Sequence, residues 1–411
     1  MTAIRFLTPT EEMFFDMGAF IGYTVCVRGS LDEQRLSDAF AVLRDRYPAL
    51  RARLGLVDGR LVYAAADGPL PGISVREGDV DTPLAGFDPD PGRILSDLRV
   101  VGDGIRACVA LLVHHTVADA RHGLALLAQL WSLYTDRMRG EPPRSAYPES
   151  LERVLADRGV RRTDRDDNRL FTPPSGEPTP LTDGGARGHV AARARCLLSA
   201  DATTTLRDIG RDRGVTVHGL VSAAIMRAHA DVENVALPEI SYVSAVDLRT
   251  RITPAVAPTA ATDLLGYSPF HAETDTTDLV DLARGVNEQL SAQLDSGSIQ
   301  IGALYTPDLA KIAPEPASRP KTGLMGTNWG VVPPLPSPDG LLIEDFRPAS
   351  YRNPPSGVLS TDGVHGRQSH FISTFAGRLG IELMSYDASP GELATAEHKI
   401  AAVERHLMSL L

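Results

Sequence analysis

Apolar residues near the start of the chain recur at the spacing of an α-helix. Within residues 29–55, Leu36, Phe40, Leu43 and Tyr47 lie three or four positions apart, which places them on one helical face. Such a face packs against the protein core, because burial of apolar surface drives folding. The pattern therefore predicts an amphipathic helix in this segment.

Further signals mark the ends of this helix and the elements that follow it. Ser30 and Glu33 have the spacing of a capping box, and Pro48 is expected to end or bend the helix. Residues 59–68 and 104–115 are then predicted to be β-strands. The second of these strands ends in two consecutive histidines.

A histidine cluster occupies the end of the second strand. The stretch LLVHHTVADARHG, residues 111–123, contains three of the chain's 11 histidines together with Asp119. After Asp119 the period becomes helical, and one face of the predicted helix carries Leu124, Leu127, Trp131 and Tyr134. The cluster is therefore expected at a strand-to-helix junction, where side chains lie at the open edge of a sheet near amides that the new helix leaves unpaired.

The composition changes in the middle of the chain. Proline, glycine and serine become frequent from about Asp136 to Gly188, which indicates a crossover between two halves. We predict an N-terminal lobe over residues 1–170 that carries the histidine cluster, a crossover linker over 171–190, and a C-terminal lobe over 191–411.

The second half mixes the two kinds of element. Its predicted strands cover residues 192–199, 239–249, 322–332, 370–377 and 379–387. Its predicted helices cover residues 200–214, 216–231, 276–297 and 390–411, and Gly214 is expected to cap the first of them. Because strands and helices are interspersed in both halves, the predicted fold class is α+β (mixed α/β).

Composition and charge narrow the class of protein. With 411 residues, the chain exceeds what one hydrophobic core organises, and roughly two to three domains are expected. An apolar content of 43% and a charged content of 23% are typical of a soluble globular protein. The net charge of −11 argues against a nucleic-acid partner, since phosphate contacts need a basic face.

The cysteines and the N-terminal residues point to a location. Cys26, Cys108 and Cys196 lie far apart and form no CxxC pair, so no disulfide framework is expected and a reducing cytoplasm fits best. The first residues lack the basic and apolar regions of a signal peptide, and no run of about 18 apolar residues predicts a transmembrane segment. We therefore expect a cytoplasmic protein.

The histidine cluster has three interpretations. His115, Asp119 and His122 have helical spacing and are suitable ligand types for zinc or iron, but His115 belongs to the strand and no further ligand lies nearby. A neutral imidazole can instead act as a general base, with a carboxylate helping to hold its loop. The histidines could also be ordinary packing or surface residues.

Several segments resemble the condensation-domain and chloramphenicol-acetyltransferase-like acyltransferases. HHTVAD resembles the HHxxxD part of the HHxxxDG motif of that superfamily. LDEQRLSDAFAVLRDRYPALRARL resembles its first helix and HPxLR turn, with Tyr47 where histidine is usual. LSADATTTLRDIGRDRGVTVHGLVSAAI and FAGRLGIELMSYD resemble later parts of the superfamily, in the same order.

A narrower resemblance covers nearly the whole chain. VLADRGVRR, VDLRTRITPAVAPTAATDLLG and GRLGIELMSYD resemble the polyketide-associated acyltransferases typified by phthiocerol/phthiodiolone dimycocerosyl transferase. This resemblance implies two chloramphenicol-acetyltransferase-like lobes that form a V, with a tunnel between them open on two faces. It places His115 in that tunnel as the catalytic base.

The resemblance also implies which residues support the base. His114 would support the turn from behind, because consecutive residues of a strand face opposite sides. Asp119 would be structural and paired with an arginine, for which Arg249 is the candidate and Arg251 and Arg106 are competitors. A buried pair of this kind would be bidentate and would lock the turn.

Three more residues are candidates for the tunnel or for a latch between the lobes. Ala120 stands where the motif has glycine, and its Cβ would cost on the order of 1 kcal/mol if that position required a positive φ. The methyl group could also narrow the approach of the thioester arm. Asn328 and Trp329 lie in GTNWGVVPP, which resembles the family's DFGWG-like segment, although packing explains Trp329 better than substrate contact does.

The predicted function is O-acyl transfer. An acyl group would leave a thioester, on coenzyme A or on the phosphopantetheine arm of an acyl carrier protein, and form an ester with a hydroxylated polyketide, lipid or natural-product acceptor. An amine acceptor stays open. We expect no permanently bound cofactor, no metal, no covalent acyl-enzyme and a monomer.

Two other functions compete with this one. His114 and Asp119 also match the HxxxxD motif of glycerolipid acyltransferases, but the membrane-associating segments of that class are not found in this sequence. A degenerate condensation-like module would dock a carrier protein without chemistry. The arginine-rich stretch within residues 153–169 could supply a basic docking patch for an acidic carrier protein, although nearby aspartates offset its charge.

Overall fold

The chain folds into two compact units, each of which combines β-sheet with α-helices. The computed structural model describes residues 2–66, 68–136, 145–164, 171, 173–174, 176–181, 188–275, 278–311, 322–353, 368–386 and 389–411. The first unit comprises Met1–Val190, Ile252–Leu264 and Pro333–Val358, and the second comprises Ala191–Arg251, Leu265–Val332 and Leu359–Leu411. The predicted mixed α/β class is confirmed. Part of the predicted crossover, at residues 172, 175 and 182–187, lies outside the described residues.

A six-stranded sheet forms the centre of the first unit. Its strands, in spatial order, are β5 (Ser74–Glu77), β6 (Ser96–Gly102), β7 (Arg106–His114), β2 (Ala19–Gly29), β13 (Leu341–Arg352) and β8 (His189–Val190). Strand β7 runs antiparallel to both of its neighbours, and all of its residues after Ala107 are buried. This burial explains the uninterrupted apolar run that precedes the histidines.

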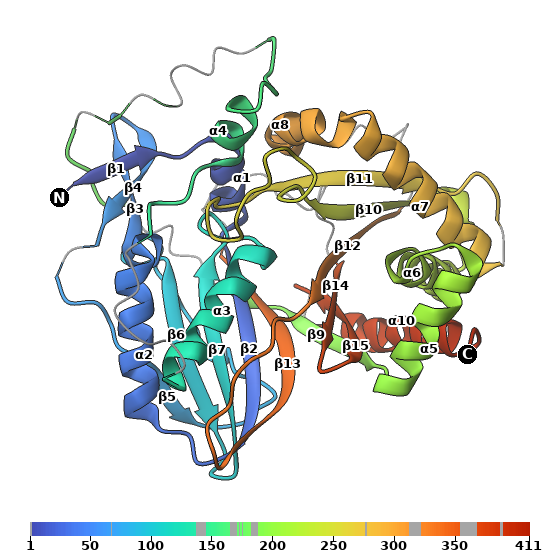
Figure 1. The fold of residues 1–411 in the computed structure, drawn as a ribbon, viewed down its shortest axis with the longest axis horizontal. Helices are drawn as coiled ribbons and strands as arrows, with labels where there is room; N and C mark the ends of the chain where they lie inside the picture. Colours follow the sequence, from blue (N-terminus) through green and yellow to red (C-terminus); the bar gives the residue numbers. More distant parts are fainter. Residues whose placement is uncertain are drawn as a thin grey trace. The chain divides into compact units, whose positions relative to one another are not determined.

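In the described residues, a smaller sheet and four α-helices complete the first unit. The smaller sheet has the order β1 (Ala3–Phe6), β4 (Arg60–Ala65) and β3 (Ala52–Val57). The helices of the described part are α1 (Pro9–Met17), α2 (Glu33–Arg46), α3 (Ala120–Tyr134) and α4 (Leu151–Ala156), with a 3₁₀ turn η1 at Pro48–Arg51. Helix α2 packs against α3, which lies on strand β2 (Figure 1).

The first predicted helix corresponds to α2, with one correction at its start. Leu36, Phe40, Leu43 and Tyr47 are buried as the spacing predicts, and the helix ends just before Pro48. The predicted capping box at Ser30 is wrong, because the N-cap is Asp32, whose carboxylate accepts a hydrogen bond from the Arg35 amide. A carboxylate at this position also interacts favourably with the helix dipole.

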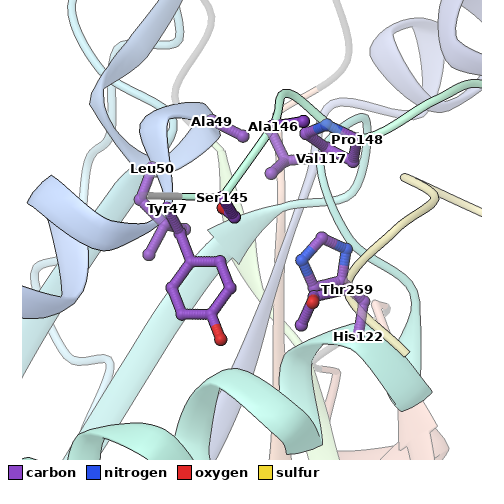
Figure 2. Close-up of a pocket in the computed structure, with 9 residues that line it drawn as sticks. All are labelled: Tyr47, Ala49, Leu50, Val117, His122, Ser145, Ala146, Pro148 and Thr259. Carbon is purple, nitrogen blue, oxygen red and sulfur yellow. The ribbon is translucent and has the colours of Figure 1, made fainter. Parts of the chain in front are cut away.

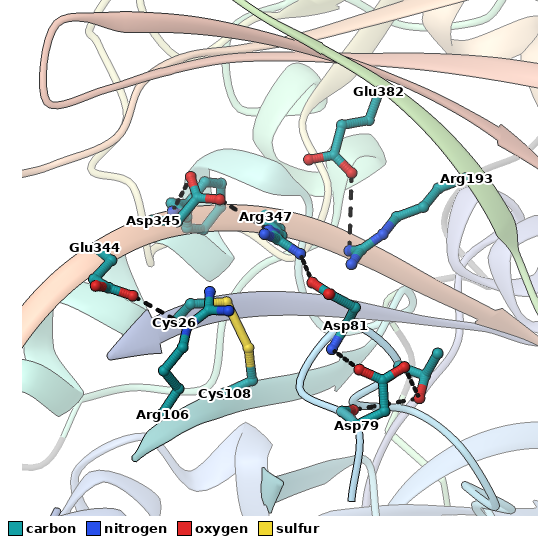
Figure 3. The surroundings of a disulfide bond; sticks show 12 residues. Cys26, Asp79, Asp81, Arg106, Cys108, Arg193, Glu344, Asp345, Arg347 and Glu382 are labelled. Atoms are coloured by element: carbon teal, nitrogen blue, oxygen red, sulfur yellow. Dashed lines mark hydrogen bonds and ion pairs between the residues drawn. A yellow bond between two sulfur atoms is a disulfide. The ribbon is translucent and has the colours of Figure 1, made fainter. Parts of the chain in front are cut away.

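Cys26 and Cys108 form a disulfide, so the expectation that the cysteines form none was wrong. The two residues are 82 positions apart in sequence but lie directly opposite each other on β2 and β7 (Figure 3). Pairing of distant strands brings them together, which spacing along the chain does not reveal. Cys196 is a buried free thiol.

The second unit is built on another six-stranded sheet. Its order is β11 (Leu265–His271), β10 (Ile240–Asp247), β12 (Thr322–Val331), β14 (Gln368–Phe375), β15 (Arg378–Ser385) and β9 (Ala192–Leu197). Strand β12 runs parallel to both of its neighbours, whereas the other pairs are antiparallel.

Helices pack on this second sheet and enclose a core. They are α5 (Ala200–Arg213), α6 (Val217–Glu233), α7 (Leu279–Asp295), α8 (Ser298–Lys311) and α10 (Pro390–Met408), with a 3₁₀ turn η3 at Leu237–Glu239. Helix α6 packs against both α7 and α10. Gly214 ends α5 in the left-handed conformation, with a φ of 67°, as predicted. Within the described ranges, no helix is long and apolar enough to cross a membrane.

Candidate active site

Strand β7 places two consecutive histidines at its carboxyl end. His114 closes the strand opposite Phe20, and His115 begins the turn that leads into α3. The His115 amide donates a hydrogen bond of 2.8 Å to the carbonyl of Ala19, so the backbone stays attached to β2 where the strand ends. The predicted strand-to-helix junction is thus present.

His114 is buried beneath this turn. Its Nδ1 lies 2.9 Å from Oγ1 of Thr116 and accepts a hydrogen bond of 3.3 Å from the Thr116 amide. Phe20 contacts its ring edge to face, with the centroids 4.9 Å apart. Burial, with a smaller effect of His115, lowers the pKa of His114 to about 3, so this imidazole is neutral at physiological pH. These contacts are consistent with a structural role in which His114 supports the turn.

His115 faces a different environment. Phe14 of α1 stacks on its imidazole at 4.0 Å between centroids, with an interplanar angle of 6°. Nδ1 of His115 is buried and lies 3.0 Å from Oδ1 of Asp263, whose side chain is fully buried. The His115 side chain keeps an exposed fraction of 16%. Since Nδ1 is buried, the accessible part of this side chain lies away from Asp263.

Backbone contacts on both sides of Asp263 hold it in place. The Leu264 amide donates to Oδ2 of Asp119 at 2.9 Å, and the Thr262 carbonyl accepts from the Asp119 amide at 3.2 Å. Thr262 also donates from its amide to the Glu149 carbonyl, at 2.9 Å. The segment that carries Asp263 is therefore attached to the first turn of α3.

Asp119 is the N-cap of α3. Its Oδ1 accepts a hydrogen bond of 3.0 Å from the His122 amide, and its carbonyl accepts one of 3.0 Å from the Tyr23 hydroxyl. Together with the Oδ2 contact to Leu264, these bonds use both carboxylate oxygens. The residue thus joins the histidine turn to the segment behind it, in line with the structural role implied by the family motif.

An ion pair between half-buried Arg5 and fully buried Glu11 supports the same segment from α1. Arg5 makes two hydrogen bonds to Glu11, at 2.7 and 2.6 Å, and Oε1 of Glu11 accepts one of 2.9 Å from the Thr262 hydroxyl. Burial disfavours the charge of Arg5, but Glu11 outweighs this effect and raises the pKa of Arg5. The helix that carries Phe14 is therefore fixed to the segment that carries Asp263.

His115 and Asp263 influence each other's protonation. Burial alone would lower the pKa of His115, but the charge of Asp263 outweighs burial and raises it above its usual value. Burial raises the pKa of Asp263 to about 7, with His115 opposing this shift and Asp119 and Glu11 adding to it. Both shifts favour states in which the pair holds a proton near neutral pH, so the pair titrates as one unit.

Ala120 is the first residue of α3 and is not among the described residues with positive φ. Its Cβ therefore causes no backbone strain. Gly123, one turn later, is the glycine that this junction needs, because a Cβ there would lie 1.8 Å from the Tyr23 ring.

The remaining candidates belong to the second unit. Arg249 is buried and donates a hydrogen bond of 3.0 Å to Asp247, and its predicted pairing with Asp119 stays a prediction. Trp329 is buried in β12 and packs edge to face on Phe371, which fits the packing explanation. Asn328 is exposed and accepts a hydrogen bond from the Gly330 amide.

The residues of the alternative metal site have other partners. Nδ1 of His122 lies 2.9 Å from the Ala261 carbonyl and can donate to it, while Asp119 caps the helix. Within the part of the chain that the structure describes, no group of three His, Cys, Asp or Glu residues could hold a metal ion.

His122 also lines a small pocket in the first unit. Tyr47 lies across the pocket from it, and the empty space is about 210 Å³, part of it open to solvent (Figure 2). His115 is not among the lining residues, so we do not place the reacting groups there.

The arginine-rich stretch is only partly described. Arg165 and Arg169 lie outside the described residues. Arg162 pairs with Asp164 at 2.8 Å, Arg153 pairs with Asp157 at 3.3 Å, and Arg158 donates to the Pro254 carbonyl. These local partners reduce the charge available to a docking protein.

Sequence reasoning missed two side chains that contact the His115 ring, Phe14 and Asp263. Phe14 lies in a helix that was not predicted, and Asp263 lies in a loop more than 140 positions along the chain. The available signal was one acidic residue between alanine, threonine and leucine in AATDLLG, since a lone acid in an apolar segment is often buried for a reason.

Comparisons with known proteins show which family the chain resembles. Residues 187–384 match the family model of the phthiocerol/phthiodiolone dimycocerosyl transferase C-terminus. The phthiocerol/phthiodiolone dimycocerosyl transferase of Mycobacterium tuberculosis is 31% identical over 95% of this chain and 94% of its own. The Mycobacterium leprae protein of that name is 30% identical over 85% of this chain and 86% of its own.

Solved structures extend the comparison to the fold. Polyketide synthase associated protein 5 from Mycobacterium tuberculosis has a TM-score of 0.80 and 30% identity, covering 99% of this chain and 97% of the other. The first condensation domain of the CDA synthetase has a TM-score of 0.65 at 17% identity, covering 100% and 95% of the two chains, and shares the fold alone. The similarity to the dimycocerosyl transferases spans nearly the whole of both proteins. The chain is therefore an acyltransferase that belongs to the phthiocerol/phthiodiolone dimycocerosyl transferase family.

Proposed function

We propose that this acyltransferase moves an acyl group from a thioester to a hydroxyl group and forms an ester, with His115 as the general base. The donor is an acyl group on an acyl carrier protein or on coenzyme A. The acceptor is a hydroxylated polyketide, lipid or related natural product, a class named by analogy with the relatives, which are called phthiocerol/phthiodiolone dimycocerosyl transferases.

The observation that carries the proposal is the asymmetric environment of the His115 ring. Nδ1 is buried against Asp263, whereas the accessible part of the side chain lies on the other side. Nε2 is accordingly the atom assigned to the substrate, and a general base must come within hydrogen-bonding reach of the proton that it removes.

The chemistry requires one proton to move twice. Nε2 takes the proton of the acceptor hydroxyl as its oxygen attacks the thioester carbonyl, which gives a tetrahedral intermediate. When the intermediate collapses, the C–S bond breaks and the imidazolium returns the proton to the leaving thiolate. No covalent acyl-enzyme is needed.

The other candidate residues act around this base. His114 and Asp119 support the turn, and Arg249 is proposed as the partner of Asp119. Ala120, Asn328 and Trp329 are proposed to shape the tunnel between the lobes or the latch beside it. We further propose that the enzyme acts in the cytoplasm, where both donor classes occur, and that it is a monomer.

The proposal is tested by comparing the wild type with His115→Ala. The assay measures thiol release from acyl-coenzyme A and from acyl carrier protein in the presence of a panel of alcohols. Loss of the base should lower turnover by about 10²- to 10⁴-fold. His189→Gln, at an exposed histidine in β8, is the matched control, and circular dichroism checks that each variant is folded. Wild-type turnover in folded His115→Ala would refute the proposal.

The alternative function gives a different result in the same experiment. A degenerate module would bind the carrier protein, but the wild type would release no thiol from either donor with any alcohol. The retained His115 and its carboxylate contact favour the enzyme, because a protein that only docks a partner has no use for them.

A further inference from the structure

Asp263 has few partners for a buried carboxylate. Its side chain is fully buried, and within the described residues no amide or hydroxyl group donates to either carboxylate oxygen. Its ion-pair contact in the described part of the chain is Nδ1 of His115, at 3.0 Å. A buried charge is costly unless a group of opposite charge or a proton donor faces it. The carboxylate therefore depends on what His115 offers at Nδ1.

We propose that Asp263 is the positioning residue of the general base, which keeps a proton on Nδ1 of His115 and so leaves Nε2 free to accept one. This inference rests on the proposed function, since it names the group that selects the reacting atom. A neutral imidazole carries its proton on one nitrogen only, and the partner of one nitrogen decides the state of the other.

The placement of Asp263 is rigid enough for this role. Its two neighbours in sequence are bound to Asp119, to Glu149 and to Glu11, through contacts of 2.9 to 3.2 Å. Phe14 stacks on one face of the imidazole, and this packing restricts rotation of the His115 side chain. Ring and carboxylate are therefore held independently, and their contact does not rely on either side chain alone.

The other charges around the pair come from three elements. Asp119, at the start of α3, acts on both members of the pair, and Glu11, from α1, acts on Asp263. Arg5 pairs with Glu11, and neutral His114 lies on the strand side. The surroundings of the pair are therefore acidic, which favours a positive imidazolium when Nε2 receives the proton of the acceptor.

The test compares Asp263→Asn with the wild type. Asparagine keeps the size of the side chain but removes the charge, and its amide can donate to Nδ1 and thereby shift the proton to Nε2. We expect kcat to fall by at least about 10-fold, and by no more than the roughly 10²- to 10⁴-fold that a general base contributes. KM should change less than about twofold, because substrate binding does not involve Asp263.

A pH profile separates positioning from simple structural support. Asp263 raises the pKa of His115 and His115 is a base only when neutral, so removal of the charge should move the acid limb of the kcat profile to lower pH. Asp103→Asn is the matched control: Asp103 accepts backbone hydrogen bonds in the exposed hairpin before β7, and its loss should leave kcat and the profile unchanged. An unchanged kcat and profile in folded Asp263→Asn would overturn the inference.

A second measurement does not depend on turnover. Nitrogen-15 spectra of histidine-labelled wild-type protein, assigned by comparison with His115→Gln, report which nitrogen of His115 carries the proton. We expect the Nδ1–H form in the wild type, and an Nε2–H form in the wild type would overturn the inference even if Asp263→Asn does not fold. If His115→Ala keeps wild-type activity, the proposed function fails, whereas the spectra still decide whether Asp263 holds the Nδ1 proton.

Discussion

Phe14 and His115 stack face to face, with their ring centroids 4.0 Å apart and their planes inclined by 6°. The stack covers one side of the imidazole with an apolar ring that offers no hydrogen bond. The orientation of His115 is therefore set by packing on its face and by a carboxylate at its edge. The two restraints come from segments far apart in sequence, and each can be removed separately.

Replacement of Phe14 by leucine removes the flat partner of the imidazole but keeps the site apolar. We expect kcat to fall by about 10-fold, because the reacting group must be held within a narrow range of geometry. The free energy of unfolding should fall by about 1 kcal/mol, as for a conservative core exchange. Phe40→Leu, in α2, is the control for stability, and an equal kcat in the two variants would argue against a role for the stack.

Arg5→Gln tests the ion pair that anchors α1. The change leaves the fully buried Glu11 without its cation, which typically costs about 3–5 kcal/mol of unfolding free energy. Urea unfolding at pH 7 measures this loss. The double variant Arg5→Gln/Glu11→Gln should regain much of it, because no uncompensated charge remains, and equal instability of the single and double variants would contradict the explanation.

Ala120→Gly restores the glycine of the family motif. Since Ala120 has an ordinary helical φ, we expect no gain in kcat/KM and a loss of up to about 1 kcal/mol in unfolding free energy. Ala125→Gly, in the same helix, is the matched control. A rise of tenfold or more in kcat/KM for Ala120→Gly alone would show instead that the methyl group obstructs the substrate.

Buried histidines predict a loss of stability in acid. Burial lowers the pKa of His229 to about 4, with Lys399 adding to the effect, and lowers that of His370 to about 3. The unfolded chain binds these protons near the ordinary value of about 6.5, whereas the folded chain does not. The free energy of unfolding should therefore fall as the pH drops from about 6.5 towards 4, by up to about 1.4 kcal/mol per pH unit for each such histidine.

Urea unfolding at pH 7 and pH 5 measures this effect. In the described structure neither ring nitrogen of His229 has a hydrogen-bond partner, so His229→Leu should lose little stability at pH 7 and should show a smaller decline at pH 5. His398→Gln, at an exposed histidine of α10, serves as the control variant. A pH dependence in His229→Leu equal to that of the wild type would contradict the prediction.

The sequence predicted features that depend on neighbouring residues. The apolar run before His114 and the helical period after Asp119 are local patterns, and they correspond to β7 and α3. The end of α5 at Gly214 was equally predictable, because a left-handed residue favours glycine. These features need no information about the rest of the fold.

Features that depend on distant segments were not predictable in this way. The Cys26–Cys108 bond requires the pairing register of β2 and β7, and the contact of Asp263 with His115 requires the course of a loop from the other half of the chain. The N-cap of α2 was also mispredicted. Ser30 and Asp32 are both suitable N-cap residues, and only the backbone geometry selects Asp32. The pairing of distant segments was missing in the first two cases, and the local backbone geometry was missing in the third.

The first unit includes two segments from the second half of the chain, and this constrains how such enzymes can be recombined. A fragment that stopped near residue 190 would lack β13 and leave β2 as an unprotected edge strand, prone to aggregate. A hybrid of two relatives joined in the crossover would combine the histidine of one parent with the aspartate-bearing loop of the other. The two halves of the gene are therefore expected to be inherited together, because neither encodes a complete catalytic lobe.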